Sequence, residues 1–495
     1  MEHKITTLLN WCTSNNIQID KRLRVVPDVT GLAVYSGSAL IETSQTLVKI
    51  PKTAVLSVKS CSASQFIETN PYGLEAQLAL SLALLIEIQR GTSSRWYGYL
   101  QSLPETMVDL PVFWDLEIGG RTLEDGMEAL KWLRGTEVQK LLAGPDGNPL
   151  IESIRKYFIE IVVPTTARFS MKIAAGFLQP TFHQFCRAYS LVSSRAFLVD
   201  AYHGLSMVPI ADAFNHLDDH RVHLETEYEV CPECGSLQQC PHDQSTELSS
   251  NHLTPNNSND KPIQIDDTYD MVSNATISPY SEVFNTYGET TSNAQLLAQY
   301  GFSLDVNEND SISWDFDDLI NFLEAGSQAR DLSAPLGLPW NLLSDSFDED
   351  VFSESELVFK PSDAAFCINC EGKISWQLWL VIVSHKCARL VPANQVVALS
   401  SELGRYHISR EKDDFETDIS GMNNSLSQEI AYTVVELCQQ YKAQLGAGKD
   451  QESLGNLLDE QALSQYRTKL ALLQVITEFS IVDSCEAGWQ DLCGE

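Results

Sequence analysis

Three cysteines and a histidine lie close together near the middle of the chain and offer a set of metal ligands. Cys231 and Cys234 form a Cys-x-x-Cys pair with a proline inside it and a glycine after it, and Cys240 and His242 follow shortly. Such a pair forms a tight turn whose amides point at a thiolate, and three thiolates with one imidazole complete a tetrahedral zinc site. The interval before Cys240 is short for a zinc ribbon, so free surface thiols are the alternative. We expect a structural Zn²⁺ ion here, with no part in catalysis.

Polar and aromatic residues also recur in two segments that are far apart in the sequence. Residues 209–216 read Pro-Ile-Ala-Asp-Ala-Phe-Asn-His and shortly follow Ser-Arg-Ala-Phe at 194–197. Residues 285–302 begin with Asn-Thr-Tyr-Gly and end with Tyr-Gly-Phe. An Asn-His pair alone is more often a loop or helix-cap feature than a functional site. The chain has no glycine-rich loop of the Rossmann or phosphate-loop type, so these segments are its best candidates for chemistry.

Taken together and in this order, the segments resemble the SET-domain family of protein methyltransferases. The particular resemblance is to the subgroup of Rubisco large-subunit and ribosomal-protein lysine methyltransferases. Four further segments agree with that subgroup: Ser-Arg-Trp-Tyr-Gly-Tyr-Leu at 94–100, Leu-Pro at 103–104, residues 111–114 and Leu-Arg-Gly-Thr at 133–136. The resemblance runs from about residue 25 to 305 and continues more weakly toward the C-terminus. It implies S-adenosyl-L-methionine as cofactor and a protein lysine as methyl acceptor.

The resemblance assigns a cofactor role to several of these residues. Asn215 and His216 would hold the amino-acid part of S-adenosyl-L-methionine at a knot-like crossing of the chain, with Asp212 in the same wall. Arg195 would pair with the cofactor carboxylate, a charge-assisted contact that suits a guanidinium.

The resemblance also places aromatic residues at the reacting end of the site. Tyr287 would stand at the point of methyl transfer, and Tyr300 and Phe197 would line the channel for the target side chain. Core packing with a satisfied hydroxyl is the alternative for both tyrosines. Some members of the subgroup methylate histidine, and the aromatic pair at 197 and 300 favours lysine.

One segment departs from the family pattern. Where the family usually has Glu-Gly-x-Gly, this chain has Thr30, Gly31, Leu32 and Ala33. Thr30, Gly31 and Leu32 would contact the cofactor mainly through their backbone, and Ala33 is compatible with that loop if its φ is negative. If this loop fails to bind, the chain would instead be a catalytically inactive SET-fold binding module.

Hydrophobic periodicity predicts the elements that position these residues. Alternation over residues 31–58 predicts short strands, as do residues 222–230 and 282–287. Helical spacing is found at residues 70–90, 123–133, 138–142, 150–161, 182–198, 376–383, 427–445 and 460–479. Residues 245–262 are rich in Ser, Asn and Pro and predict a surface loop.

The predicted fold class is α+β, in two domains. Residues 1–305 would form a SET domain of knotted β-strands, with a helical insert at about 61–190 and a Cys-rich, low-complexity insertion at about 231–262. Residues 306–495 would form an all-helical domain that resembles the family's substrate-binding domain.

Composition narrows the class of partner. The 495 residues include 67 acidic and 33 basic side chains, for a net charge of −34, and residues 310–363 alone hold thirteen acids and two basic residues. This charge disfavours nucleic acid and anionic membranes, and it favours a basic protein substrate, with ribosomal proteins and translation factors ahead of histones. The sequence offers no apolar run of bilayer length and no export signal, so we expect reduced thiols and a location in the cytoplasm or nucleus. We also expect a monomer. The second Cys-x-x-Cys pair, Cys367 and Cys370, has no adjacent partner pair and is assigned a structural role.

Overall fold

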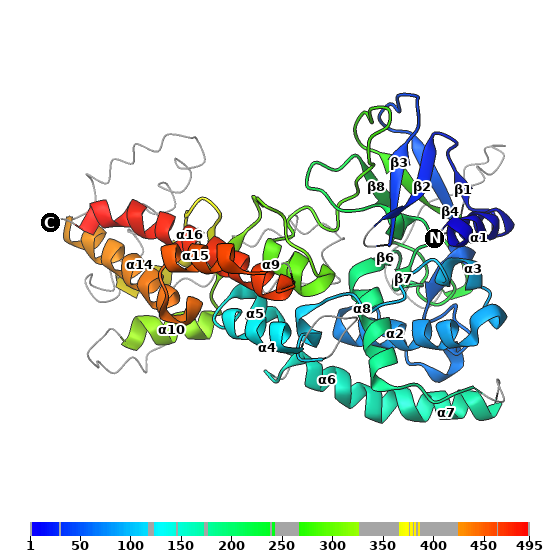
Figure 1. Ribbon diagram of the computed structural model, residues 1–495, viewed down its shortest axis with the longest axis horizontal. Coiled ribbons are helices and arrows are strands. Elements are labelled where there is room, and N and C mark those ends of the chain that lie inside the picture. The colour runs from blue at the N-terminus through cyan, green and yellow to red at the C-terminus, as the bar shows by residue number, and fades with distance from the viewer. Residues whose placement is uncertain are drawn as a thin grey trace, which may run out of the picture.

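The computed structural model describes residues 2–28, 31–116, 123–144, 147–172, 177–237, 240–242, 267–325, 366–375, 377–379, 381–382, 385–386, 424–462 and 464–493. Thr30, the polar stretch 245–262 and most of the acidic run lie outside these residues. The molecule is elongated, with strands and helices of the N-terminal half at one end and the C-terminal helices at the other (Figure 1). Of the helices that the structure describes, none is long and apolar enough to cross a bilayer.

The strands are short and pair in small antiparallel sheets. Their bounds are β1 Gln18–Ile19, β2 Leu23–Asp28, β3 Gly31–Ser36, β4 Thr46–Pro51, β5 Leu56–Ser57, β6 Ala196–Leu198, β7 Leu205–Met207, β8 Val222–Glu225, β9 Thr268–Ser273, β10 Ser311–Ser313 and β11 Cys367–Asn369. One sheet has the order β1-β4-β9-β8, another the order β5-β7-β6, and β2 pairs with β3. Strands from before and after the long helical insertion therefore share sheets, and the strands predicted within residues 31–58 are confirmed.

Several predicted elements differ from the structure, among them the helix predicted over 460–479, which begins at Tyr466 and ends at Cys493. Of the strand predicted over 222–230, only Val222–Glu225 forms one. Residues 282–287 form isolated bridges instead of a strand, because they pass between separate pieces of chain and no partner runs alongside them far enough for a ladder. The helix predicted over 182–198 ends at Arg195, because the next three residues pair with β7.

Helices of the N-terminal half include those that the periodicity predicted. Their bounds are α1 Glu2–Ser14, α2 Gly73–Arg90, α3 Tyr97–Leu100, α4 Leu123–Trp132, α5 Glu137–Leu141, α6 Leu150–Tyr157, α7 Val163–Lys172 and α8 Phe182–Arg195, with a π-helical turn Phe158–Val162 between α6 and α7. Further on lie α9 Asn293–Gln295, a π-helical turn Leu296–Tyr300 and α10 Phe316–Ala325.

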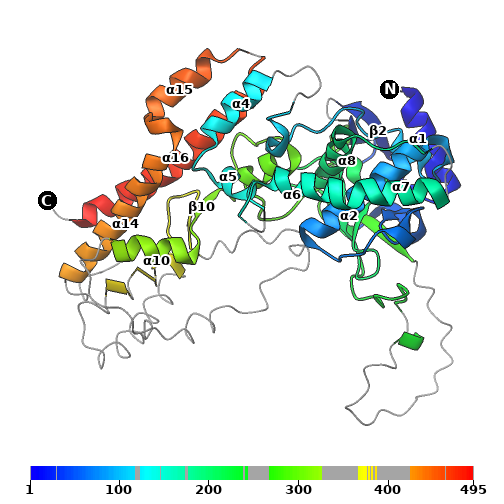
Figure 2. The same ribbon diagram turned by 90° about the horizontal axis from the view of Figure 1, so that it is seen from below.

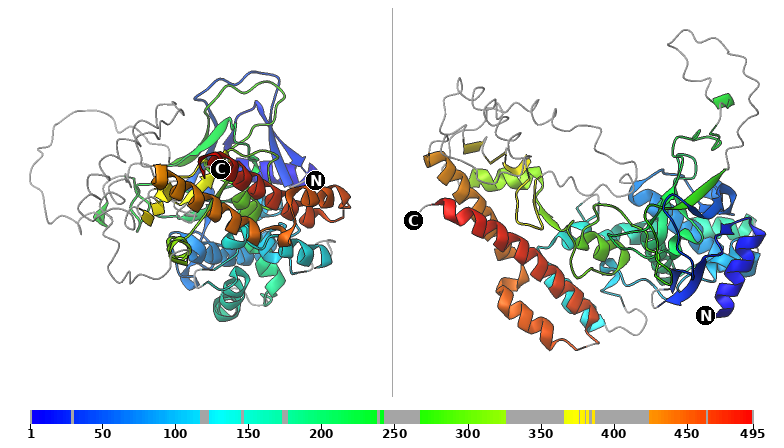
Figure 3. Two further views of the ribbon diagram at one scale, coloured as in Figure 1. Left: turned by 90° about the vertical axis from the view of Figure 1, so that its left-hand side faces the viewer. Right: turned by 90° about the horizontal axis from the view of Figure 1, so that it is seen from above.

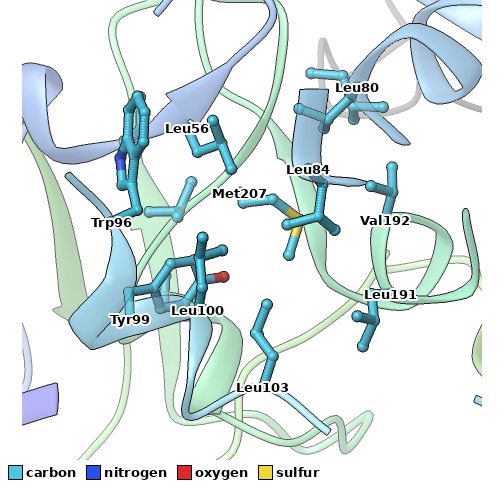
Figure 4. Close-up of a cluster of buried hydrophobic side chains, with 14 of the residues drawn as sticks. Leu56, Leu80, Leu84, Trp96, Tyr99, Leu100, Leu103, Leu191, Val192 and Met207 are labelled. Carbon is cyan, nitrogen blue, oxygen red and sulfur yellow. The ribbon is translucent and has the colours of Figure 1, made fainter. Parts of the chain in front are cut away.

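The main core forms where α2 and α8 pack against the strands. Every residue from 76 to 87 of α2 is buried, as expected for a helix that is apolar on all sides. Figure 4 shows Leu80 and Leu84 of α2 facing Leu191 and Val192 of α8, with Met207 of β7 between the two helices and the loop that carries Trp96. Tyr99 and Leu103 belong both to this cluster and to the lining of the cleft described below.

The C-terminal part is built mainly from α14 (Asn424–Gln444), α15 (Gln451–Glu460) and α16 (Tyr466–Cys493). The prediction that it is all-helical is wrong, because β10 and β11 pair antiparallel there. Ile312 and Ile368 face each other in that pair and are fully buried, so the two strands add to the apolar core of this part.

The helical insertion contacts both parts of the molecule. Whereas α2 and α8 pack on the strands, α4 lies alongside α16, as Figure 2 and the right-hand view of Figure 3 show from opposite sides. A separate apolar cluster joins them, made of Trp114, Ala129, Leu133, Val138, Ala294, Leu297, Leu470 and Ala471. The long C-terminal helix is thus anchored on a segment that precedes it by more than half the chain.

Candidate active site

Two segments that are distant in the sequence cross at Asn285, which is 2% exposed. On one side Asn285 N donates to the carbonyl oxygen of Asn215 (2.8 Å), and Leu217 N donates to the carbonyl oxygen of Asn285 (3.1 Å). On the other side Arg221 N donates to the carbonyl oxygen of Phe284 (2.9 Å). The chain at Asn285 therefore runs between two other pieces of backbone, and the segments 209–216 and 285–302 meet at this point.

Asp212 lies just before the crossing, in the 3-10 turn Ala211–Ala213. Tyr99 donates its hydroxyl to Asp212 Oδ2 (2.7 Å), and Arg195 donates Nη1 to the Asp212 carbonyl oxygen (2.9 Å). Burial raises the pKa of Asp212, and the nearby Arg195 and Tyr99 oppose that shift only partly. The preceding Ile210 has a φ of 74°, a costly conformation for a β-branched residue that persists only where the surroundings fix it.

A small cleft opens beside these residues. Its lining comprises Leu8, Gly31, Leu32, Tyr99, Ser102, Leu103, Pro104, Arg195, Ile210, Asp212 and Ala213. Gly31 has a φ of 141°, and a Cβ at this position would lie 3.2 Å from Arg195 Nη2 and 3.5 Å from Pro104. The short Cβ distance shows that the Gly31 backbone closely approaches the guanidinium. Because of this approach and the positive φ, only glycine fits there without strain. Four of the predicted cofactor residues, Gly31, Leu32, Arg195 and Asp212, thus line one cleft.

The Asn215 side chain is oriented by an acid that the sequence analysis did not single out. Asn215 donates Nδ2 to Glu282 Oε1 (2.7 Å), and Tyr35 donates its hydroxyl to Glu282 Oε2 (3.1 Å). The Glu282 carboxylate raises the pKa of Tyr35 through this hydrogen bond. The one available signal was that Glu282 lies three residues before the segment 285–302. A single sequence cannot distinguish such an acid from an ordinary surface residue.

A hydrogen bond from the Tyr287 backbone to the His216 side chain and ring stacking join these two residues. Tyr287 N donates to His216 Nδ1 (3.0 Å), so this nitrogen carries no proton, and burial lowers the pKa of His216. The rings of His216 and Tyr287 stack, with centroids 5.1 Å apart. The Tyr287 hydroxyl donates to the carbonyl oxygen of Phe214 (3.4 Å), and burial raises the pKa of Tyr287 to about 12. Tyr287 is therefore a neutral phenol at physiological pH, beside a neutral imidazole.

Tyr300 completes the group from the end of the π-helical turn Leu296–Tyr300, and Gly301 follows it with a φ of 79°. The rings of Tyr300 and Tyr287 stack at 4.5 Å with an interplanar angle of 21°, and burial raises the pKa of Tyr300. Phe302, which was not assigned a role from the sequence, lies within 6.5 Å of the rings of His216, Tyr287 and Tyr300. These four residues form what we call the aromatic cluster. Local departures from α-helix such as this π-helical turn often occur at functional sites.

Two other predicted residues are placed less directly. Phe197 is half-buried in β6, opposite Ser206, and among the described ring contacts it has none with the aromatic cluster. Thr30 lies outside the described residues. Ala33 lies in β3 opposite Val26 and does not have a positive φ. The replacement of the family's second glycine by alanine is therefore compatible with this backbone.

The four predicted metal ligands lie in the connection between β8 and β9, apart from the aromatic cluster. One potential ligand atom from each of Cys231, Cys234, Cys240 and His242 lies within 4.8 Å of the other three. Burial raises the pKa of the Cys231 thiol. Hydrogen bonds from backbone amides and from the neighbouring thiols outweigh this effect and lower the pKa to about 7. The structure therefore brings together all four residues that the sequence analysis grouped.

The amino-acid sequence is similar to those of named lysine methyltransferases. No family model matches the chain. The chain is 25% identical over 340 residues to a Saccharomyces cerevisiae protein named ribosomal lysine N-methyltransferase 3, an alignment that spans 57% of this chain and 58% of that protein. It is 24% identical over 502 residues to the mouse N-lysine methyltransferase SETD6, covering 95% of this chain and 90% of that one.

Solved structures resemble the whole chain. A crystal structure described as the SET domain of LSMT bound to lysine and AdoHcy has a TM-score of 0.55 at 16% identity and covers 99% of this chain and 92% of that one. Rubisco LSMT bound to AdoMet has a TM-score of 0.53 at 15% identity over the same shares.

Proposed function

Because the chain has the SET-domain fold and is similar to protein-lysine methyltransferases, we propose that it transfers a methyl group from S-adenosyl-L-methionine to a lysine of another protein. The observation that carries the proposal is the contact of Tyr287 with both Phe214 and His216 at the crossing, next to the cleft that Gly31 and Arg195 line. Both halves of a methyl-transfer site, a cofactor cleft and an aromatic channel, would then adjoin one another.

The cleft residues would hold the amino-acid end of the cofactor. Arg195, fixed by its hydrogen bond to the Asp212 carbonyl, offers a guanidinium to the carboxylate, and the backbone of Gly31 passes close beside it. Asn215 is oriented by Glu282, and His216 by the amide of Tyr287, so neither side chain needs to reorganise on binding.

The reaction itself asks mainly for alignment. The lysine nitrogen forms a bond to the methyl carbon as the bond from carbon to sulfur breaks, which yields methyl-lysine and S-adenosylhomocysteine, while the amine proton passes to solvent. With a pKa near 10.4, only about one lysine in a few thousand is neutral at pH 7. Burial among Tyr287, Tyr300 and Phe302 disfavours the charged amine, and the protonated Tyr287 hydroxyl is able to accept from it.

The same proposal assigns roles to the crossing at Asn285 and to the C-terminal helices. The backbone around Asn285 would complete the knot-like crossing of a SET domain, a reading supported by its parallel bridges to both His216 and Val222. The C-terminal helices would serve as a substrate-binding domain. A net charge of −34 favours a basic protein as substrate, and the name of the yeast relative makes ribosomal proteins the first class to test.

The test compares wild type with Tyr287→Phe in transfer of labelled methyl groups to a cell extract. We expect the substitution to lower the rate about 10- to 100-fold while binding of S-adenosylhomocysteine, measured by calorimetry, stays within about threefold. Tyr72→Phe is the matched control, because Tyr72 is 51% exposed and should leave the rate unchanged.

Other results of these binding and transfer measurements would contradict parts of the proposal. Binding of S-adenosylhomocysteine without transfer to any protein would leave a binding module, and absence of binding would remove the cofactor from the proposal. Mass spectrometry of the labelled residue decides the acceptor, and a methylated histidine would refute the lysine assignment.

A further inference from the structure

We propose that Cys231, Cys234, Cys240 and His242 bind one zinc ion, and that this ion fastens the connection between β8 and β9 onto the turn between β6 and β7. None of these four residues lines the cleft beside Arg195 or belongs to the aromatic cluster. Zinc binding can therefore be tested independently of the proposed methyl transfer.

The spacing of the donor atoms fits a tetrahedral ion. Cys231 Sγ and Cys240 Sγ each lie 3.6 Å from His242 Nδ1, and one donor atom from each of the four residues lies within 4.8 Å of the others. With Zn–S bonds of about 2.3 Å and Zn–N bonds of about 2.0 to 2.1 Å, a tetrahedral site separates sulfur from nitrogen by about 3.5 to 3.6 Å. The two Cys–His separations therefore match the edges of such a site. Thiolate and imidazole ligands select zinc over magnesium or calcium, which prefer oxygen.

The backbone around Cys231 has the form of a metal-binding turn. Gly235 N donates to the carbonyl oxygen of Cys231 (2.7 Å), and Cys231 N donates to the carbonyl oxygen of Ser236 (2.9 Å). Gly235 has a φ of 73°, which a residue with a side chain would adopt only at a cost. This closed turn brings Cys234 back toward Cys231 and holds the pair for two further ligands from residues 240–242.

Contacts with the rest of the chain show where this turn is held. Lys59 Nζ donates to the Pro232 carbonyl oxygen (2.6 Å) and lies 4.3 Å from the ring centroid of Tyr202. A Cβ on Gly235 would lie 3.1 Å from the same Tyr202 ring, so the turn packs directly on that ring. Ala201 N donates to the carbonyl oxygen of Tyr228, which joins the two connections again.

The described part of this connection buries little apolar surface, so a bound ion would supply stability that packing does not. Among residues 226–237 and 240–242, Val230 is the one buried hydrophobic side chain. A short segment without a core of its own is commonly stabilised by a structural metal, whose binding free energy then becomes folding free energy. The ion would thereby brace the turn that follows β6, the strand that begins directly after Arg195.

The test measures the metal content of the full-length chain purified without chelator. We expect about one zinc ion per chain for wild type and a loss of at least about tenfold in Cys234→Ser. The matched control is Cys370→Ser in the other Cys-x-x-Cys pair, which should keep its zinc. In wild type, cobalt should replace zinc and give the charge-transfer bands of thiolate ligands with the visible bands of a tetrahedral ion.

A second measurement keeps the proposal testable if Cys234→Ser does not fold. Titration of wild type with a mercurial reagent should release zinc, chelation should lower the unfolding temperature, and added zinc should restore it. A wild-type chain that contains no zinc and takes up neither zinc nor cobalt would overturn the proposal. So would a Cys370→Ser variant that loses its zinc while Cys234→Ser keeps it.

Discussion

The carboxylate of Asp125 caps a helix that belongs to a distant part of the chain. Asp125 lies in α4, and its oxygens accept hydrogen bonds from Arg467 N (3.1 Å), Thr468 N (3.1 Å) and Thr468 Oγ1 (2.7 Å). These groups lie in the first turn of α16, where backbone amides have no partner within the helix. Asp125 is 4% exposed, so water cannot take its place without rearrangement. We therefore predict that Asp125→Ala destabilises the contact between α4 and α16.

The magnitude follows from the bonds that are lost. Removing a helix cap costs about 1 to 2 kcal/mol, and leaving a further buried donor without a partner adds about 1 to 3 kcal/mol. We expect Asp125→Ala to lower the free energy of unfolding by about 3 kcal/mol. Asp125→Asn keeps one carbonyl oxygen as acceptor and should cost about half as much.

The assay is urea unfolding followed by circular dichroism, together with hydrogen exchange to locate the change at the start of α16. Asp450→Ala is the matched control, because Asp450 caps α15 through Ser453 N (2.8 Å) at an exposed site. Loss of that exposed cap should cost about 0.5 to 1 kcal/mol. If Asp125→Ala costs no more than Asp450→Ala, or if exchange at the start of α16 is unchanged, the buried cap does not hold this helix.

Two further predictions concern a buried acid and the cleft. Burial and the Glu137 carboxylate raise the pKa of Glu478 to about 8, above its unfolded value, so the stability that its protonated form contributes is present at low pH and lost as pH rises toward 8. Glu478→Gln should remove about 2 to 5 kcal/mol of this pH dependence in unfolding measured from pH 5 to 9, and an unchanged slope would contradict the assignment. Gly31→Ala places a Cβ 3.2 Å from Arg195 Nη2 at a φ of 141°, so calorimetry should show an affinity for S-adenosylhomocysteine reduced at least about tenfold. Affinity equal to wild type would show that the Gly31 backbone does not contact the ligand.

The sequence alone does not reveal that Glu478 is buried beside Glu137. In the sequence it is one acid in a helical pattern, and 67 acidic residues offer no reason to select it. In the structure it accepts hydrogen bonds from Glu137 N and the Tyr441 hydroxyl, groups that α5 and α14 bring to it. The same holds for Glu282, whose partners Tyr35 and Asn215 come from separate segments.

The sequence by itself determined the local features of this protein. Helical spacing marked α2, because each turn of a buried helix repeats the apolar pattern along the chain. The Cys-x-x-Cys pair and its neighbours indicated the Cys/His group, because all four residues lie within a stretch of twelve residues. Motif order also indicated the SET domain, since the residues that meet at the crossing occur in two recognisable segments.

Only the tertiary structure decided how these pieces combine. The passage of Asn285 between two backbones, the contact of α4 with α16 and the strand pair β10-β11 join residues that are tens to hundreds of positions apart. Such contacts are set by the packing of whole elements, and local spacing carries no record of them. Tertiary context also settled Ala33, because whether alanine can replace glycine depends on its φ, and the pairing of β3 with β2 keeps that φ out of the positive range.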